Sequence, residues 1–492
     1  MEHTLNSRPR TVLELKRTGW RSRTVRQELR ENLIAKLRAR ETVFPGVVGY
    51  DASVLPQLEN ALLSGHDFIL LGLRGQAKTR LLRALPALLD ELLPAVDGCE
   101  IRDDPLEPVC AACRRRAAEL GDALPIRWLT RDERYGEKLA TPDVTIADLI
   151  GDIDPIKAAT RRLTFADPDV VHYGLIPRSN RGLFAINELP DLAPRIQVGL
   201  LGILEEGDVQ IRGFPLRLEL DIVLAFSANP EDYTNRGSII TPLRDRIASQ
   251  ILTHYPRTLD EARAITSQEA WTERSGAPAV TVPDYLREAL EEVAFQARAS
   301  EFVDQSSGVS ARVGIALLEN VISAAERRAL RTGEREVVAR ASDLYSAVPA
   351  ITGKVELVYE GEKEGTQKVA LHLIGRALKV VFDRRLPDAY AAKEQHGHGD
   401  FEPVLGWFQG GRSVDVSDSL GSEALGERLG DIPGLEEIAR KYLGARARAE
   451  VVAAMEFVID GLHQSSLLAR NEVIGGRVYR DMFEEMVKDL ES

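Results

Sequence analysis

One segment restricts the fold of this chain more than any other: a short apolar run that ends in a glycine-rich turn and a lysine. Phe68-Ile-Leu-Leu71 has the length and composition of a buried strand, and Gly72-Leu-Arg-Gly-Gln-Ala-Lys-Thr79 connects it to a stretch with helical periodicity. Small residues let backbone N–H groups turn toward a phosphate, and the following helix N-terminus adds its dipole. In this pattern Lys78 reaches the β- and γ-phosphates, and the Thr79 hydroxyl ligates Mg²⁺. The segment therefore predicts a phosphate-binding loop for ATP.

The remaining residues of this segment are expected to contact the nucleotide as well. The full set of expected contacts is Gly72, Arg74, Gly75, Gln76, Ala77, Lys78, Thr79 and Arg80, together with Gly49 ahead of the strand. Ala77 departs from the usual pattern, in which glycine precedes the lysine. A methyl group is tolerated there if the residue has helical backbone angles, so we interpret the segment as a variant of the loop. The alternative, a glycine turn beside a surface lysine, fits less well between a strand and a helix.

Two further apolar strands end in polar residues. Leu183-Phe-Ala-Ile186 is followed by Asn187 and Glu188, and the run from Ile222 to Ser227 is followed closely by Asn229. Parallel strands end at one edge of a sheet, so these side chains are expected beside the phosphate loop. We expect Glu188 to polarise the attacking water, Asn187 to help hold Mg²⁺, and Asn229 to hold the water or sense the γ-phosphate. Aspartate is usual at the position of Asn187, so slow hydrolysis is one expected consequence.

The rest of the chain is expected to form an α/β domain followed by helical regions. Short apolar runs alternate with helical segments after Val47, which is typical of a parallel sheet with crossover helices. We expect strands at 68–71, 126–129, 183–187, 222–227 and 250–253, helices at 78–92 and 193–205, and a hairpin at 209–220. The expected divisions are a helical lead-in over 1–45, an α/β domain over 46–256 with a cysteine-containing insertion at about 97–120, a helical domain over 257–385, a loop or linker over 386–431, and a helical unit over 432–492.

The three cysteines of the chain, Cys99, Cys110 and Cys113, are close together in the sequence. A CxxC pair with a third thiol nearby indicates a structural Zn²⁺ site that needs one more ligand. A carboxylate, Asp103 or Asp104, or a distant histidine, His172, would supply it. Free or redox-reversible thiols are the alternative.

Net charge and hydropathy limit the partners and the compartment. The net charge of −13 argues against broad binding of a nucleic-acid backbone, which needs a large cationic surface. No apolar run approaches the roughly 20 residues that a membrane helix needs, and the N-terminal region does not resemble a secretory signal. We therefore expect a cytoplasmic protein, with nucleic acid an improbable partner.

These blocks, in this order, resemble the AAA+ clade that contains the magnesium chelatase ATPase subunit and the MoxR-type ATPases, over roughly 47–350. The stretches 141–154 and 174–182 are similar to the inserted segment and to the approach to the Walker B strand in that clade. The hairpin at 209–220 is similar to the clade's hairpin before sensor 1. The resemblance implies a P-loop AAA+ domain, then an all-helical lid and a mainly helical C-terminal region.

The resemblance also gives expected roles to three arginines. Leu243-Arg-Asp-Arg-Ile247 is similar to the stretch that supplies the arginine finger, so Arg246 is expected to contact a γ-phosphate bound by the neighbouring subunit, with Arg244 as second choice. Ser310-Ala-Arg312 resembles sensor 2, which implies that Arg312 contacts the nucleotide from the lid of the same chain. Without the resemblance, each arginine is more typical of a surface ion pair.

A ring, commonly a hexamer, with ATP at the subunit interfaces is what the resemblance implies, and such rings remodel or activate a partner protein. Partners in this clade typically carry a von Willebrand A domain. The cysteines and the segment after about Val355 do not match the core pattern of the clade. Two other functions stay open: a nucleotide-gated scaffold with weak hydrolysis, and the ATPase subunit of a tetrapyrrole metal chelatase.

Overall fold

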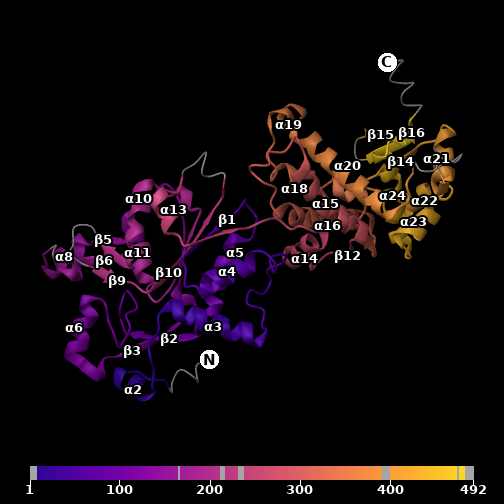
Figure 1. Ribbon diagram of the computed structural model, residues 1–492. Coiled ribbons are helices and arrows are strands. Elements are labelled where there is room, and N and C mark those ends of the chain that lie inside the picture. Colours follow the sequence, from indigo (N-terminus) through magenta and orange to yellow (C-terminus); the bar gives the residue numbers. More distant parts are fainter. Residues whose placement is uncertain are drawn as a thin grey trace. The chain divides into compact units, whose positions relative to one another are not determined.

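The computed structural model describes residues 8–164, 167–210, 217–230, 238–389, 399–473 and 476–482 (Figure 1). The chain divides into two compact units, Met1–His254 and Tyr255–Ser492. The division lies two residues before the boundary expected at 256/257, and the N-terminal helices belong to the first unit instead of forming a separate one.

A five-stranded sheet of order β11-β1-β10-β7-β4 organises the first unit. Its strands are β1 (Phe68–Leu71), β4 (Tyr135–Leu139), β7 (Gly182–Asn187), β10 (Ile222–Ala228) and β11 (Ser249–Leu252), and every neighbouring pair is parallel. β7 and β10 are buried along their whole length, which explains why they are continuous apolar runs.

Helices cover both faces of this sheet (Figure 1). Side chains of α3 (Val25–Ala39), α4 (Val54–Leu63) and α5 (Lys78–Ala84) form one apolar core with the strands. Side chains of α10 (Pro194–Gly199) and α11 (Leu201–Glu206) form the core on the other face. The sheet is thus the middle layer of three.

Two expectations for this region are wrong. The segment expected as a core strand at 126–129 is β3 (Ile126–Thr130), which pairs antiparallel with β2 (Leu92–Val96) in a separate two-stranded sheet. β4 occupies the edge of the main sheet instead; its half-exposed residues, Tyr-Gly-Glu-Lys-Leu, give no apolar run to recognise. The helix expected at 78–92 ends earlier, because a 3-10 turn at Leu85–Leu88 contains Pro86 and leads into β2.

The other elements of the first unit connect these layers. They are α2 (Val12–Arg17), α6 (Ala111–Leu120), η2 (Gly121–Ala123), η3 (Asp132–Arg134), α7 (Ile146–Leu149), β5 (Gly151–Ile153), α8 (Pro155–Arg161), η4 (Pro168–Val170), β6 (Val171–Tyr173), α9 (Leu175–Arg178), η5 (Leu189–Asp191), β8 (Asp208–Gln210), β9 (Arg217–Glu219) and α13 (Thr241–Arg246). β8 and β9 pair antiparallel as the expected hairpin, whose residues 211–216 lie outside the described part of the chain.

The second unit is largely helical and has one larger apolar core. Its elements are α14 (Leu259–Glu269), β12 (Val280–Thr281), α15 (Asp284–Ala299), α16 (Arg312–Thr332), β13 (Val337–Val338), α17 (Ala341–Tyr345), α18 (Val348–Thr352), α19 (Tyr359–Glu364), α20 (Thr366–Arg385), η7 (Gly399–Phe401), α21 (Glu402–Gln409), β14 (Val414–Ser417), α22 (Ser422–Gly430), α23 (Leu435–Leu443), α24 (Arg448–Gln464), β15 (Leu468–Val473) and β16 (Gly476–Asp481).

The expected linker at 386–431 is wrong for its described residues. Besides the residues 390–398, which lie outside the description, this region forms α21, β14 and α22. β14 joins a three-stranded antiparallel sheet with β15 and β16, so the C-terminal part is not wholly helical. Val414 and Val416 alternate with polar residues and are buried, while the glycine, serine and aspartate residues are divided between these elements and the turns.

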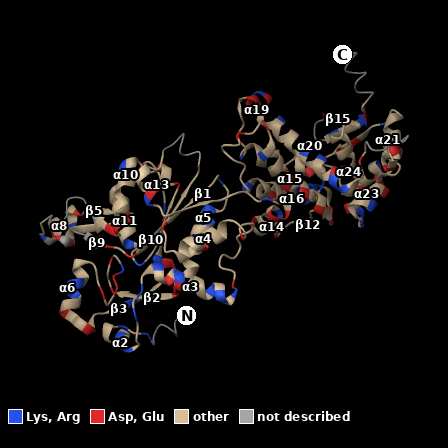
Figure 2. Cartoon of the chain, viewed as in Figure 1, with Lys and Arg blue, Asp and Glu red and all other residues tan. Residues whose placement is uncertain are grey.

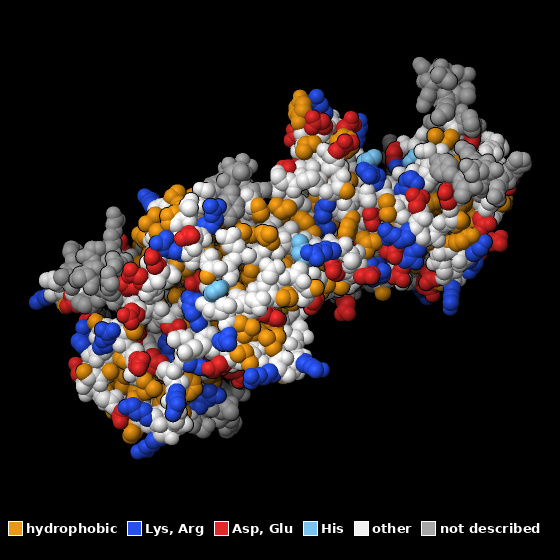
Figure 3. All heavy atoms as spheres, in the orientation of Figure 1, with side chains coloured by type: hydrophobic (Ala, Val, Ile, Leu, Met, Phe, Trp, Pro, Cys, Tyr) orange, Lys and Arg blue, Asp and Glu red, His pale blue; other side chains and the backbone are white. Residues whose placement is uncertain are grey.

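Charged side chains lie mainly on the helices, and the strands β1 and β10 carry none (Figure 2). On the face shown in Figure 3, basic and acidic side chains are interspersed. Within the described ranges, no helix has both the length and the apolar composition that crossing a bilayer requires.

Candidate functional site

The predicted phosphate loop, residues 72–79, lies where β1 ends and α5 begins, and its lysine is held from two sides. Lys78 Nζ donates hydrogen bonds to the carbonyl oxygens of Gly72 and of Leu73, the latter at 3.0 Å, and to Asn229 Oδ1 at 2.6 Å. The lysine is 6% exposed. The ammonium group is therefore already placed between the loop and the end of the neighbouring strand β10.

Asn229 connects this lysine to the acidic residue that follows β7. Its Nδ2 donates to Glu188 Oε2 at 3.1 Å while its Oδ1 accepts from Lys78. Glu188 has left-handed backbone angles, φ 55° and ψ 50°, which a residue other than glycine adopts at a cost of order 1–3 kcal/mol. Three residues expected at the site from separate parts of the sequence thus form one hydrogen-bonded chain, although their roles stay predictions.

The backbone of Ala77 contradicts the condition under which a methyl group was expected to fit. Ala77 is not helical: its φ of 56° and ψ of 15° lie in the left-handed region. Glycine is favoured there because a Cβ crowds the backbone, so alanine costs about 1 kcal/mol. The side chain is exposed, so the strain comes from the backbone and not from a clash with neighbours.

A second set of contacts fixes the start of the loop. Thr253 Oγ1, just after β11, donates to Gln76 Oε1 at 2.7 Å and to Leu71 O at 3.2 Å. A Cβ on Gly72 would lie 1.9 Å from Thr253 Oγ1, so this position requires glycine. Tyr50 adds a hydrogen bond from its hydroxyl to Gln76 O at 2.8 Å. Neither Thr253 nor Tyr50 was expected at the site.

The other expected loop residues lie around this framework. Gly75 has a left-handed φ of 74° and Gly49, which precedes Tyr50, a φ of 79°. Thr79 is the second residue of α5 and is half-buried, as is Arg74 in the loop, whereas Arg80 is exposed. The donor set suits a triphosphate with Mg²⁺: an ammonium group, a hydroxyl, backbone N–H groups and nearby carboxylates.

Asn187 has a partner that the sequence did not indicate. Its Nδ2 donates to Glu137 Oε1 at 2.7 Å, and its Oδ1 accepts from Ser227 Oγ at 2.9 Å. Glu137 lies on the edge strand β4, whose sequence shows neither an apolar run nor a regular alternation. Its carboxylate also accepts hydrogen bonds from Arg83 on α5. A carboxylate of the neighbouring strand therefore lies beside the amide at position 187.

This pairing predicts the effect of restoring the usual aspartate. Asn187→Asp places two carboxylates in hydrogen-bond contact, which cannot both stay ionised. We expect a loss of about 1–3 kcal/mol in the free energy of unfolding, measured by urea denaturation. Because the shared proton raises one folded-state pKa, the loss should shrink as the pH is lowered.

The reciprocal variant is the control for this prediction. Adding Glu137→Gln to Asn187→Asp recreates one amide facing one carboxylate. The free energy of unfolding of this double variant should therefore lie within about 0.5 kcal/mol of that of the Glu137→Gln single variant. If Asn187→Asp alone is as stable as the wild type at neutral pH, the pairing is wrong.

The expected arginines differ in their surroundings. Arg246 on α13 is paired with Glu205 of the same chain at 2.7 Å and donates to Pro242 O at 3.0 Å. Arg244 is exposed, and no side-chain partner for it lies in the described ranges. Arg312 is the exposed first residue of α16, in the second unit.

The cysteines come together with one of their three candidate fourth ligands. Ligand atoms of Cys99, Asp103, Cys110 and Cys113 all lie within 4.8 Å of one another. Asp104 is instead paired with Arg181 at 3.1 Å, and His172 lies exposed on β6, outside the cluster. Burial, followed by the Cys99 thiolate, raises the pKa of Asp103.

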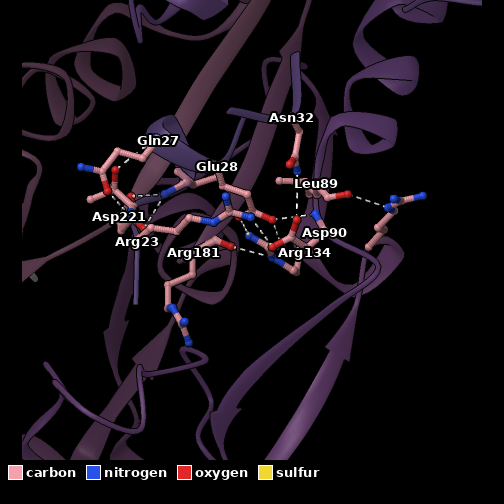
Figure 4. Close-up of polar contacts among 12 residues, drawn as sticks. Arg23, Gln27, Glu28, Asn32, Leu89, Asp90, Arg134, Arg181 and Asp221 are labelled. Atoms are coloured by element: carbon pink, nitrogen blue, oxygen red, sulfur yellow. Dashed lines mark hydrogen bonds and ion pairs between the residues drawn. The ribbon is translucent and has the colours of Figure 1, made fainter. Parts of the chain in front are cut away.

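A buried ion pair fixes the opposite end of the strands that carry the site (Figure 4). Glu28 on α3 and Arg134, just before β4, are both 1% exposed and share two hydrogen bonds, at 2.7 and 2.5 Å. Arg134 Nε also donates to the carbonyl oxygen of Arg181, next to β7, at 2.9 Å. The N-terminal helix α3 is thus an integral part of the first unit, and not a lead-in to it.

A glycine-rich turn between β1 and α5, an Asn-Glu pair at the end of β7 and an asparagine after β10 lie on one parallel sheet, an arrangement that resembles the nucleotide site of P-loop proteins. Among known proteins, the chain is similar to a subunit of magnesium chelatase. It is 29% identical over 233 residues, 46% of its length, to the magnesium-chelatase 38 kDa subunit of Cereibacter sphaeroides. It spans 64% of the length of that relative.

Other comparisons are weaker. The chain is 33% identical over 87 residues to the hydrogenase transcriptional regulatory protein HoxA of Cupriavidus necator, of which it covers 18%. A BchI–BchD complex of magnesium chelatase superposes with a TM-score of 0.34 at 21% identity, covering 65% of this chain and 98% of the other; a score this low supports no conclusion. No protein-family model matches the chain.

Proposed function

We propose that the chain binds ATP with Mg²⁺ at the phosphate loop and hydrolyses it. The observation that carries this proposal is the chain of hydrogen bonds from Lys78 through Asn229 to Glu188. It joins the group that would bind the phosphates to the group that would activate water, through an amide that can respond to either. Thr79, with Asn187 and Glu137, would hold the Mg²⁺ and its water ligands, and the metal would neutralise the phosphate charge.

Binding of ATP would change the partners of Lys78, Asn229 and Glu188. Lys78 would exchange its carbonyl partners and Asn229 for phosphate oxygens, which are stronger acceptors for an ammonium group. Asn229 would then be released to orient the attacking water, and Glu188 would accept the proton of that water. Asn229 is therefore the residue that reports the γ-phosphate to Glu188.

We further propose that several copies, as a hexameric ring, complete one another's sites. Of the two candidate fingers, the ion pair with Glu205 occupies Arg246, while Arg244 is exposed on the same helix. We therefore propose Arg244 ahead of Arg246 as the residue that reaches a neighbouring subunit, which reverses the order suggested by the resemblance. Arg312 would act within its own chain, from the helical lid.

The work done by such a ring is proposed to be the remodelling or activation of a protein partner, for which a von Willebrand A domain protein is the candidate. Two observations favour a second function, a nucleotide-gated scaffold with weak hydrolysis: the left-handed Ala77 and the amide at position 187. The similarity to a chelatase subunit favours a third, the ATPase subunit of a tetrapyrrole metal chelatase.

Mixing two inactive variants tests the proposed hydrolysis and the shared site together. Lys78→Ala removes the phosphate contact and Arg244→Ala removes the finger, the latter lowering kcat by about 10³-fold or more. In a mixed assembly, a Lys78→Ala subunit can still offer its Arg244 to an Arg244→Ala neighbour. Phosphate release over many turnovers should therefore reappear on mixing.

The control for this experiment is the double variant Lys78→Ala/Arg244→Ala, which should restore nothing when mixed with Arg244→Ala. Full activity of Arg244→Ala alone would exclude Arg244 as the finger, and the same pair of mixtures made with Arg246→Ala would then test Arg246. No detectable turnover by the wild-type protein, alone and with a von Willebrand A partner, would favour the scaffold.

A further inference from the structure

The inserted segment between β2 and β3 contains a cluster of buried groups that the nucleotide site does not use. Cys110 and Cys113 are 5% and 1% exposed, Cys99 is 9% exposed, and Asp103 is fully buried. Their ligand atoms lie within 4.8 Å of one another. In a tetrahedral site with Zn–S bonds of about 2.3 Å, sulfur atoms are about 3.8 Å apart, so a small adjustment would bring all four groups onto one ion.

Asp103 supplies the observation that separates this cluster from ordinary buried thiols. Its Oδ2 accepts a hydrogen bond from the backbone N–H of Cys110 at 2.9 Å, but its Oδ1 is buried without a hydrogen-bond donor among the described residues. A buried carboxylate oxygen with no partner costs several kcal/mol unless a cation or a proton neutralises it. The oxygen lies beside three sulfur atoms, where a cation would satisfy all four groups.

The backbone around the cluster already supports negatively charged sulfur. The N–H of Asp103 points to Cys99 Sγ at 3.4 Å, and the N–H of Cys113 points to Cys110 Sγ at 3.3 Å. Cys110 is also the N-cap of α6, so the CxxC pair lies where a helix begins. Such contacts orient thiolate ligands and stabilise their charge around a metal.

We propose that Cys99, Cys110, Cys113 and Asp103 bind one Zn²⁺ ion in a tetrahedral S₃O site. Three thiolates select a thiophilic ion over Mg²⁺ or Ca²⁺, and a site closed by four protein ligands is structural. Asp103 is the fourth ligand because it alone among the three candidates lies within the cluster.

The site would fix the start of β7, the strand that ends at Asn187 and is followed by Glu188. Asn180 Nδ2 donates to Ile101 O at 3.1 Å, and Arg181 is paired with Asp104 at 3.1 Å. Both contacts join the loop between the metal ligands to the residues immediately before β7. Zn²⁺ would therefore stabilise the first unit through this loop, without touching the nucleotide.

Metal content of the full-length protein tests the proposal. After purification without a metal-affinity tag, elemental analysis should find one zinc per chain. Cys110→Ser and Asp103→Ala should lose it, while Asp97→Asn, an exposed carboxylate in the same loop, and His172→Ala should keep it. Loss of zinc in His172→Ala with retention in Asp103→Ala would show that the ligand set is wrong.

Measurements on the wild-type protein test the site even if the variants fail to fold. Replacement of the metal by Co²⁺ should give the intense d–d and thiolate charge-transfer absorption of a tetrahedral sulfur-rich site. A strong chelator should lower the thermal midpoint of unfolding, and added Zn²⁺ should restore it. A folded, metal-free protein that gains neither zinc nor the Co²⁺ spectrum when the ion is added to the reduced chain would overturn the proposal.

Discussion

Lys78→Ala is expected to lower the affinity for ATP by between about 10²- and 10³-fold. The lysine would give charge-assisted hydrogen bonds to two phosphate groups, each contributing about 1.5–3 kcal/mol, and part of this is offset by its present bonds to Gly72, Leu73 and Asn229. Isothermal titration with a slowly hydrolysed ATP analogue measures the change directly.

The variant must be separated from a general loss of stability, because alanine would leave Oδ1 of the half-buried Asn229 without the donor Lys78. Lys78→Met keeps most of the side-chain volume and removes the ammonium group with its charge and its hydrogen bonds, so both variants should lose affinity alike. Lys16→Ala, which removes an exposed lysine paired with Asp122, should bind ATP as the wild type does. Unchanged affinity in Lys78→Met would mean that the nucleotide binds elsewhere.

The sequence predicted those parts of the fold in which burial determines the amino-acid composition. β1, β7 and β10 lie inside the sheet, so both faces of each strand must be apolar and the strands are visible as continuous runs. β4 lies at the edge, where half-exposed polar residues are tolerated, and nothing in Tyr-Gly-Glu-Lys-Leu marks it as a strand. The more apolar segment of β3 was therefore predicted as a strand of the main sheet instead.

The candidate site divides in the same way. Lys78, Glu188 and Asn229 could be named because each follows a recognisable strand, and strand ends meet at one edge. Glu137 and Thr253 act through contacts with Asn187 and Gln76, which only the pairing of strands distant in sequence creates. Partners of this kind have no local pattern.

The conformation of Ala77 and the choice between Asp103 and Asp104 could not be predicted from the sequence. The left-handed conformation of Ala77 cannot be read from a residue type that normally avoids it. Asp103 and Asp104 are equivalent in sequence as candidate ligands, and they separate only because the chain directs one to the thiols and the other to Arg181.

Glu188→Gln is expected to keep ATP bound and to lower kcat by about 10²–10⁴-fold, the usual contribution of a general base. Glutamine has nearly the same shape, and its amide oxygen can still accept the hydrogen bond from Asn229 Nδ2. The contact between Lys78 and Asn229 should therefore be unaffected, which separates this variant from Lys78→Ala. Single-turnover and multiple-turnover phosphate release, with analogue affinity measured in parallel, give both quantities.

Glu206→Gln is the matched control, because Glu206 is an exposed glutamate of the same unit, at the end of α11. This variant should hydrolyse ATP at the wild-type rate. Normal turnover by Glu188→Gln would remove Glu188 from the catalytic role and leave its strained backbone without an explanation. If turnover is lost while ATP is retained, the variant holds the protein in its ATP-bound state. A partner that recognises that state should then dissociate more slowly from Glu188→Gln than from the wild type, whereas Lys78→Met should not retain it.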